Sequence, residues 1–223
     1  MEYVYNCNNM KLESSGILIS LRPFGERDCV AHIFTSGYGV MCGMMRGAMV
    51  AKKNRPLVGQ VGVASWNARL DSQLGTFHWE PEKNLAAGVM LSRGGLGFLN
   101  SAFGLILSLL PEREQYKNLY DQTLNMLDNL CSDAATELYQ NWEIALLREM
   151  GYALDLRSCS GCGTHDDLQY LSPRTGRAVC AKCAAPYVDK LYHLPLDLNV
   201  LRHFINRACD AQGVELPLAR KIL

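Results

Sequence analysis

The chain has 223 residues, with 22 basic and 22 acidic side chains, so its formal net charge is zero. Hydrophobic residues make up 48% of it and charged residues 20%, which excludes a disordered, collagen-like or coiled-coil chain. The neutral total also argues at first against nucleic acid as a partner, because proteins that bind nucleic acid usually carry a basic excess, at least locally.

The N-terminal part of the chain predicts short strands separated by turns. Apolar segments at 16–20, 29–35, 40–45, 59–70 and 76–80 are the expected strands, and Ser36-Gly37-Tyr38-Gly39 is a hairpin signal between two of them. Five short strands with no helix between them predict a small barrel, and a five-stranded OB-type barrel is the natural candidate. We therefore expect residues 1–80 to form an OB-fold domain.

Residues 81–223 predict a second, helical domain, so the expected fold class is α+β. The uncharged stretch 94–110 has the length of the shortest membrane spans, but its glycines, serines and Asn100 favour a buried core helix. Helical spacing over the following segment places several side chains on one face: Tyr116, Tyr120, Leu124, Leu127 and Cys131.

Two further helices carry signals at their ends. One is expected to begin with Ser132 or Asp133 as its N-cap and to end at Met150, before Gly151. The last is expected over 198–211, with Asp197 as its N-cap and Gly213 just beyond its end.

Four cysteines give the sharpest local signal, and they lie in an expected insertion at about 155–190 of the helical domain. Their spacing, C-x2-C-x17-C-x2-C, is typical of a zinc site built from two C-x-x-C turns. Four thiolates leave no open position on the metal, so such a zinc ion is structural. The expected ligands are Cys159, Cys162, Cys180 and Cys183.

Alternatives for the quartet are a redox disulfide pair and an iron–sulfur cluster, and His165 is a spare ligand. The other cysteines are expected to be small buried hydrophobes: Cys7, Cys29, Cys42, Cys131 and Cys209. Nine cysteines are an odd number, and no secretory signal precedes them, so a reducing cytoplasm fits better than a secreted disulfide scaffold.

Catalytic signatures are missing from the sequence. It contains no Walker-type phosphate loop, no H-E-x-x-H and no G-x-S-x-G, and its five histidines form no spaced pair. We therefore expect a binding protein and not an enzyme.

The local charge differs from the neutral total. Residues 16–70 hold seven basic and two acidic side chains, and no acidic residue occurs over 29–70. Residues 81–150 hold five basic and nine acidic side chains, and residues 151–223 hold nine and seven. The expected barrel is therefore basic, and the helical domain offsets it.

A basic loop over 46–55 connects two expected strands. Basic side chains there would meet phosphates, and Phe24, Tyr38 and Trp66 would offer stacking faces to bases. The plain alternative is a solvated basic loop on an ordinary barrel. The expected DNA-binding residues are Arg22, Arg27, Arg46, Lys52, Lys53, Arg55 and Arg69.

Short motifs occur in a fixed order over about residues 14–205. The series is Gly16-Ile17-Leu18, Arg22-Pro23-Phe24-Gly25-Glu26, Phe34-Thr35, Gly37-Tyr38-Gly39, Arg46-Gly47-Ala48, Trp66-Asn67-Ala68-Arg69-Leu70, Leu109-Leu110-Pro111-Glu112-Arg113-Glu114, Glu149-Met150-Gly151-Tyr152, the four cysteines, and Tyr170-Leu171-Ser172-Pro173 with Gly176 between their halves. This ordered series resembles the bacterial DNA repair protein RecO family.

The resemblance implies an OB fold, a helical domain and a zinc knuckle. It also implies binding to single- and double-stranded DNA, annealing of complementary strands, and work with RecR to load RecA on DNA coated by the single-strand binding protein SSB. Arg202 and Arg207 on the last helix are expected to receive the acidic C-terminal tail of SSB. The alternatives are a zinc-containing adaptor without DNA affinity of its own, and an enzyme with an unrecognised site.

Overall fold

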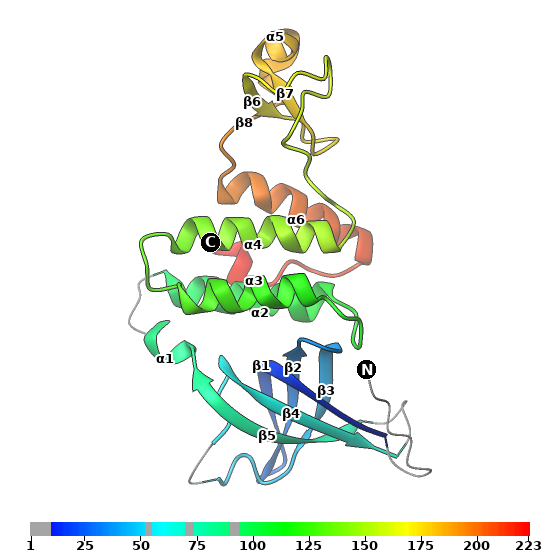
Figure 1. Ribbon diagram of the computed structural model, residues 1–223, viewed down its shortest axis with the longest axis vertical. Coiled ribbons are helices and arrows are strands. Elements are labelled where there is room, and N and C mark those ends of the chain that lie inside the picture. Colours follow the sequence, from blue (N-terminus) through cyan, green and yellow to red (C-terminus); the bar gives the residue numbers. More distant parts are fainter. Residues whose placement is uncertain (1–9, 52–54, 70–73, 90–93) are drawn as a thin grey trace. The chain divides into compact units, whose positions relative to one another are not determined.

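The computed structural model describes residues 10–51, 55–69, 74–89 and 94–223 (Figure 1). Its chain falls into two compact units: residues 1–99 with 110–131, and residues 100–109 with 132–223. These units do not coincide with a boundary at residue 80, so the expected domains 1–80 and 81–223 stay a prediction.

The first unit contains a closed barrel of five strands, in the order β1-β2-β3-β5-β4. The strands are β1 (Met10–Phe24), β2 (Asp28–Thr35), β3 (Gly39–Met45), β4 (Gln60–Ala68) and β5 (Gly75–Asn84). Four of the pairings are antiparallel, and β3 pairs with β5 in parallel. The expected OB-type barrel is therefore confirmed.

Alternating burial along the strands explains the barrel. Every second residue of β4 is buried, from Gln60 to Ala68, so one face of the strand points into the core. The longest strand, β1, begins six residues before the expected start at residue 16, because its first half pairs with β4 and its second half with β2. A fifteen-residue strand is thus needed to close the barrel.

The turn between β2 and β3 depends on a glycine. Gly39 has a φ of +65°, and a Cβ atom there would lie 1.7 Å from the carbonyl oxygen of Glu114. A backbone hydrogen bond from Arg113 N–H to Val40 O holds the segment 112–114 beside this turn. The hairpin signal is therefore confirmed, and the close approach of a second segment explains why a side chain does not fit.

Helices α1 (Ala86–Val89) and α3 (Lys117–Asp128) belong to the first unit, and α2 (Gly95–Leu109) has residues in both. The ring of Tyr120 in α3 lies edge-on to that of Phe34 in β2, with centroids 5.6 Å apart. Burial raises the pKa of Tyr120 to about 12. The expected helix face is mostly correct, but Cys131 lies beyond the end of α3 and is exposed.

The second unit contains α4 (Ala135–Glu149), α6 (Leu198–Gln212) and α7 (Leu218–Lys221). Asp197 caps α6 by accepting a hydrogen bond from Val200 N–H at 2.8 Å, and Gly213 ends the helix with a φ of +68°, as expected. The N-cap of α4 is Ala134 and not Ser132 or Asp133, because residues 132–134 form a turn of their own before the helix.

Between α4 and α6 the chain forms a small module around the four cysteines. It contains β6 (Leu168–Leu171), β7 (Ala178–Cys180), α5 (Ala181–Ala184), the 3-10 helix η1 (Ala185–Lys190) and β8 (Tyr192–His193). Its three strands pair in the order β7-β6-β8. Throughout the described part of the chain, every helix is too short or too polar to cross a membrane.

Candidate metal centre and nucleic-acid interface

The four expected cysteine ligands come together in the small module. Their sulfur atoms all lie within 4.8 Å of one another, and those of Cys162 and Cys180 are 3.7 Å apart. One pair comes from the turn that follows residue 158, and the other comes from the end of β7 and from α5. All eight cysteines that the structure describes are free thiols.

Backbone N–H groups surround the sulfur of Cys159. Gly161 and Cys180 each donate to it at 3.3 Å. These donors, the N–H of Cys180 above all, lower the pKa of the Cys159 thiol to about 6. The structure therefore favours a thiolate at Cys159, which is the form that binds metal.

The remaining thiols are crowded around that thiolate. Hydrogen bonding with Cys162 and Cys180 raises the pKa of Cys183 to about 12, so the cluster does not hold four thiolates by itself. A cation at the centre would remove this obstacle by stabilising all four charges. Gly161 lets the two halves approach, since a Cβ atom there would lie 3.0 Å from the Cys183 sulfur. These residues fit a metal ion held by four sulfurs.

The expected DNA-binding arginines lie on the surface of the barrel unit. Arg22 is on β1, Arg27 is in the turn before β2, Arg46 follows β3, Arg55 precedes β4 and Arg69 follows β4, and all five are exposed. Lys52 and Lys53 lie outside the described residues.

Two hydrogen bonds bring the turn after β3 to the turn before β2. Gly47 N–H donates to the Asp28 carboxylate at 2.7 Å, and Met49 N–H donates to the Arg27 carbonyl at 3.0 Å. Two of the expected arginines, Arg27 and Arg46, are thereby held in neighbouring turns. Asp28, an acidic residue in this basic region, serves to fix the turn.

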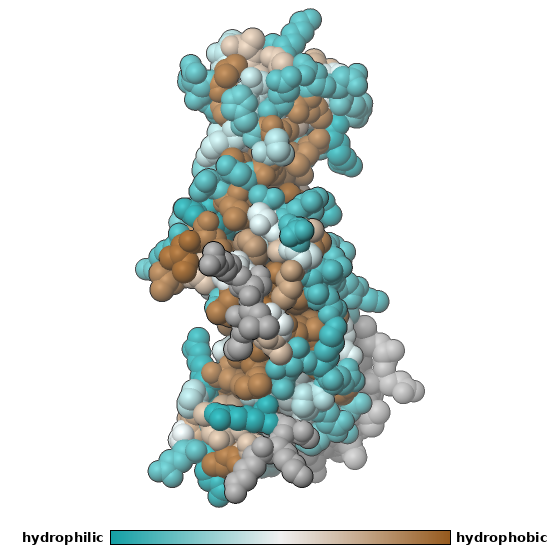
Figure 2. All heavy atoms as spheres, turned by 90° about the vertical axis from the view of Figure 1, so that its left-hand side faces the viewer, coloured by the Kyte–Doolittle hydropathy of each residue, from teal (hydrophilic) through white to brown (hydrophobic). Residues whose placement is uncertain are grey.

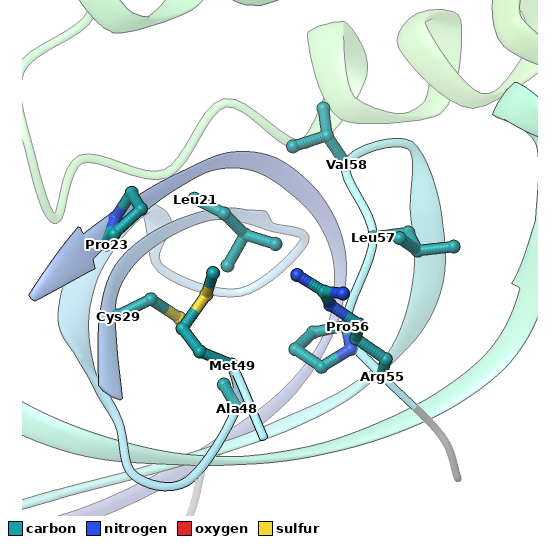
Figure 3. A pocket seen from close by; sticks show the side chains of 9 residues that line it. All are labelled: Leu21, Pro23, Cys29, Ala48, Met49, Arg55, Pro56, Leu57 and Val58. Carbon is teal, nitrogen blue, oxygen red and sulfur yellow. The ribbon is translucent and has the colours of Figure 1, made fainter. Parts of the chain in front are cut away.

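A small apolar pocket of about 230 Å³ lies beside these turns, and Arg55 is its charged lining residue. Figure 3 shows Arg55 and Pro56 on one side of it, opposite Cys29 and Met49. Arg69 is not among the residues that line this pocket. The structure thus holds Arg27 and Arg46 in neighbouring turns and places Arg55 at a pocket that Ala48 and Met49 also line.

Of the three aromatic residues expected to offer stacking faces, one is exposed in the structure, and its role in stacking stays a prediction. Phe24 is 60% exposed. Trp66, by contrast, lies inside the barrel, is 1% exposed and donates from Nε1 to the Cys42 carbonyl at 3.0 Å. Tyr38 packs against the same core. The prediction for Trp66 was wrong because the inward face of β4 holds the even-numbered residues.

In a comparison with known proteins, two family models match the N-terminal and C-terminal parts of the chain. The family model described as "Recombination protein O N terminal" matches residues 10–82, and "Recombination protein O C terminal" matches residues 95–220. The chain belongs to the RecO family. Relatives named "DNA repair protein RecO" include one from Jannaschia sp., which is 41% identical over 190 residues, or 84% of this chain and 76% of the relative.

Two other RecO relatives match almost end to end. The relative from Rhodospirillum centenum is 40% identical over 231 residues, covering 95% of this chain and 92% of its own length. One from Cereibacter sphaeroides is 32% identical over 229 residues, covering 95% of each chain. The resemblance to the RecO family that the short motifs indicate is therefore confirmed.

A second group of potential metal ligands in this RecO family member escapes sequence reasoning. Donor atoms of His32, Cys42 and Glu112 lie within 4.8 Å of one another, and His32 Nδ1 is buried without a hydrogen-bond partner in the described structure. The pairing of β2 with β3 sets His32 opposite Cys42. An isolated bridge between Val40 and Glu112 brings the carboxylate to the same strand, so the group depends on contacts that local sequence patterns do not reveal.

The two expected partner-binding arginines lie on α6. Arg207 donates from Nη1 to the carbonyl oxygens of Pro173 and Arg174 at 2.9 and 3.1 Å. Nε of Arg202 is buried without a partner among the described residues. Binding of the SSB tail by these residues stays a prediction, and Arg207 also has a structural role.

Proposed function

We propose that this chain is a non-enzymatic DNA-binding and strand-annealing mediator of recombinational DNA repair in the cytoplasm. In this role it works with RecR to load RecA on single-stranded DNA coated by SSB. The observation that carries the proposal is the set of exposed arginines around the barrel turns of a RecO family member: Arg22, Arg27, Arg46, Arg55 and Arg69.

The proposed chemistry of binding is electrostatic. Arginine guanidinium groups contact phosphates and release counterions, so the affinity falls as salt rises. Phosphate contacts carry no sequence information, so binding is independent of sequence. The proposal includes Lys52 and Lys53, which lie outside the described residues, as further phosphate contacts.

We propose zinc as the ion of the four-cysteine module, bound by Cys159, Cys162, Cys180 and Cys183. When bound, the ion supplies folding free energy to the module and no reaction chemistry. The two N–H donors to Cys159 keep one thiolate ready for it.

Charge reversal at the barrel tests DNA binding. Arg46→Glu with Arg55→Glu should weaken binding to a fluorescent single-stranded oligonucleotide and flatten its salt dependence, by about 0.7 in the logarithmic slope for each phosphate that is no longer neutralised. Arg148→Glu, at an exposed residue of α4, is the matched control. Equal affinities and slopes for all three proteins would rule out the barrel as the DNA site.

An annealing assay tests the wider role. The wild-type chain with RecR should speed annealing of SSB-coated complementary oligonucleotides, and the barrel variant should not. The alternative is an adaptor, which would bind RecR or SSB in the same experiment but show no affinity for naked DNA.

A further inference from the structure

A groove on the four-cysteine module carries a second set of basic side chains. Its volume is about 710 Å³, and it runs between the turn that joins β6 to β7 and the segment formed by α5 and η1. The side chains that matter below are Ser172, Arg174, Thr175, Arg177, Tyr187 and Lys190.

The charge of the groove has one sign. Three of its lining residues are basic, and none of the described residues that line it is acidic. Arg177 Nε lies 3.8 Å from the Asp155 carboxylate outside the lining, which offsets part of one charge. Arg174 and Lys190 form no ion pair within the described part of the chain. The groove therefore attracts anions.

The turn that presents Arg174 is held rigidly. Gly176 N–H donates to Ser172 O at 2.9 Å, and Ser172 N–H donates to Arg177 O at 3.0 Å. From α6, Arg207 donates to the carbonyl oxygen of Arg174 at 3.1 Å. A cation on a fixed turn loses less conformational entropy on binding than one on a free loop.

An aromatic ring completes the groove. Tyr187 on η1 is 58% exposed, although large aromatic side chains are usually well covered. On the face that Figure 2 shows, the surface of this module is mostly hydrophilic. An exposed ring among cations is the combination that single-strand binding proteins use, with rings for bases and cations for phosphates.

We infer that this groove is a second binding site for single-stranded DNA. The cations and the hydroxyl groups of Ser172 and Thr175 suit repeated phosphates, and the single exposed ring suits one base. These features favour a nucleic acid over an acidic peptide. The choice of ligand rests on the proposed function, but the site lies in a different part of the chain from the barrel arginines.

Three variants of the whole 223-residue chain test the inference. Arg174→Glu with Lys190→Glu removes the charge, Tyr187→Ala removes the ring, and Tyr187→Phe keeps it. Arg157→Glu is the control, because its side chain is 90% exposed in the same module but does not line the groove. Metal content and circular dichroism check that each variant is folded.

Binding is measured by anisotropy with a labelled oligonucleotide, in wild type and in the barrel variant Arg46→Glu/Arg55→Glu. The charge variant and Tyr187→Ala should each weaken binding about tenfold, while Tyr187→Phe and Arg157→Glu should stay within about twofold. An oligonucleotide with 5-iodouracil should crosslink to the peptide that contains Tyr187 in the unmutated protein.

The outcomes separate this inference from the proposed function. Wild type that does not bind the oligonucleotide contradicts both. If the barrel variant weakens binding, the groove variants do not, and no crosslink forms near Tyr187, then the inference about the groove is overturned and the proposed function stands. If the groove variants instead bind the oligonucleotide as wild type does and lose binding only to a labelled peptide of alternating Asp and Phe, the groove is a peptide site. That result would also overturn the inference.

Discussion

Arg220 of α7 and Glu143 of α4 form an ion pair in which both side chains are fully buried. The guanidinium donates to both carboxylate oxygens, at 2.5 and 3.0 Å, and to the Leu198 carbonyl at 2.7 Å. The hydroxyl of Tyr139 donates to the same carboxylate at 2.6 Å, and burial raises the pKa of this tyrosine. This pair joins three helices of the second unit at one point.

Removing one partner should strongly destabilise that unit. Glu143→Ala leaves the Arg220 guanidinium buried without a counterion, and we expect the free energy of unfolding to fall by about 3–5 kcal/mol. Urea unfolding measures this loss of free energy, and hydrogen exchange of α4 shows whether it falls on the second unit. The double variant Glu143→Met/Arg220→Met should recover most of that stability, because it leaves no charge behind. A single variant as stable as wild type would contradict this interpretation.

Metal removal should unfold the small module and spare the barrel. A chelator that strips the ion, or the variant Cys180→Ser, should increase hydrogen exchange over residues 155–195 and leave that of β1 to β5 unchanged. Cys131→Ser is the control, because this cysteine is exposed and lies outside the cluster. If protein purified without chelator contains no metal and its module is still protected from hydrogen exchange, the expectation that the metal holds the module folded is wrong.

A methyl group at Gly39 should cost more than one at Gly47. Both residues have a left-handed backbone, with φ of +65° and +69°, so alanine at either is strained by about 1–2 kcal/mol. At Gly47 no atom lies within 4 Å of the added Cβ, whereas at Gly39 the Glu114 carbonyl oxygen lies at 1.7 Å. Thermal unfolding should rank Gly39→Ala well below Gly47→Ala, and equal melting temperatures would mean that the Glu114 segment moves away.

Stability should fall in mild acid because of His32. Burial lowers the pKa of His32, and the Arg22 charge lowers it further, while Glu112 opposes the shift. Between the folded pKa and about 6.5, the unfolded chain binds more protons, so the free energy of unfolding decreases as the pH falls through this range. His32→Gln should remove that part of the pH dependence in urea titrations from about pH 7.5 to 5. An unchanged slope would contradict it.

Local patterns made much of the fold predictable. Alternation along 60–68 and the turn at Gly39 identify barrel strands, and the cysteine spacing identifies the sulfur cluster, because each depends on neighbours in the sequence. Contacts between segments that are distant in the sequence cannot be predicted from such local patterns. The six extra residues of β1 are ordered by β4, and Trp66 turns inward because of strand register. Likewise, only the folded module brings Arg174 and Lys190 to one groove.

The double pairing of β1 limits how a partner can recognise this protein. Since β1 joins both β2 and β4, these three strands each pair with a neighbour on both sides, and a strand of another chain could be added only beside β3 and β5, which pair with each other over two residues each. The module sheet has edges, but β7 has three residues and β8 has two. Little edge is therefore open to strand addition, and partners that bind these sheets mainly recognise side chains and their charges, so single substitutions on the surface should be able to separate one partner from another.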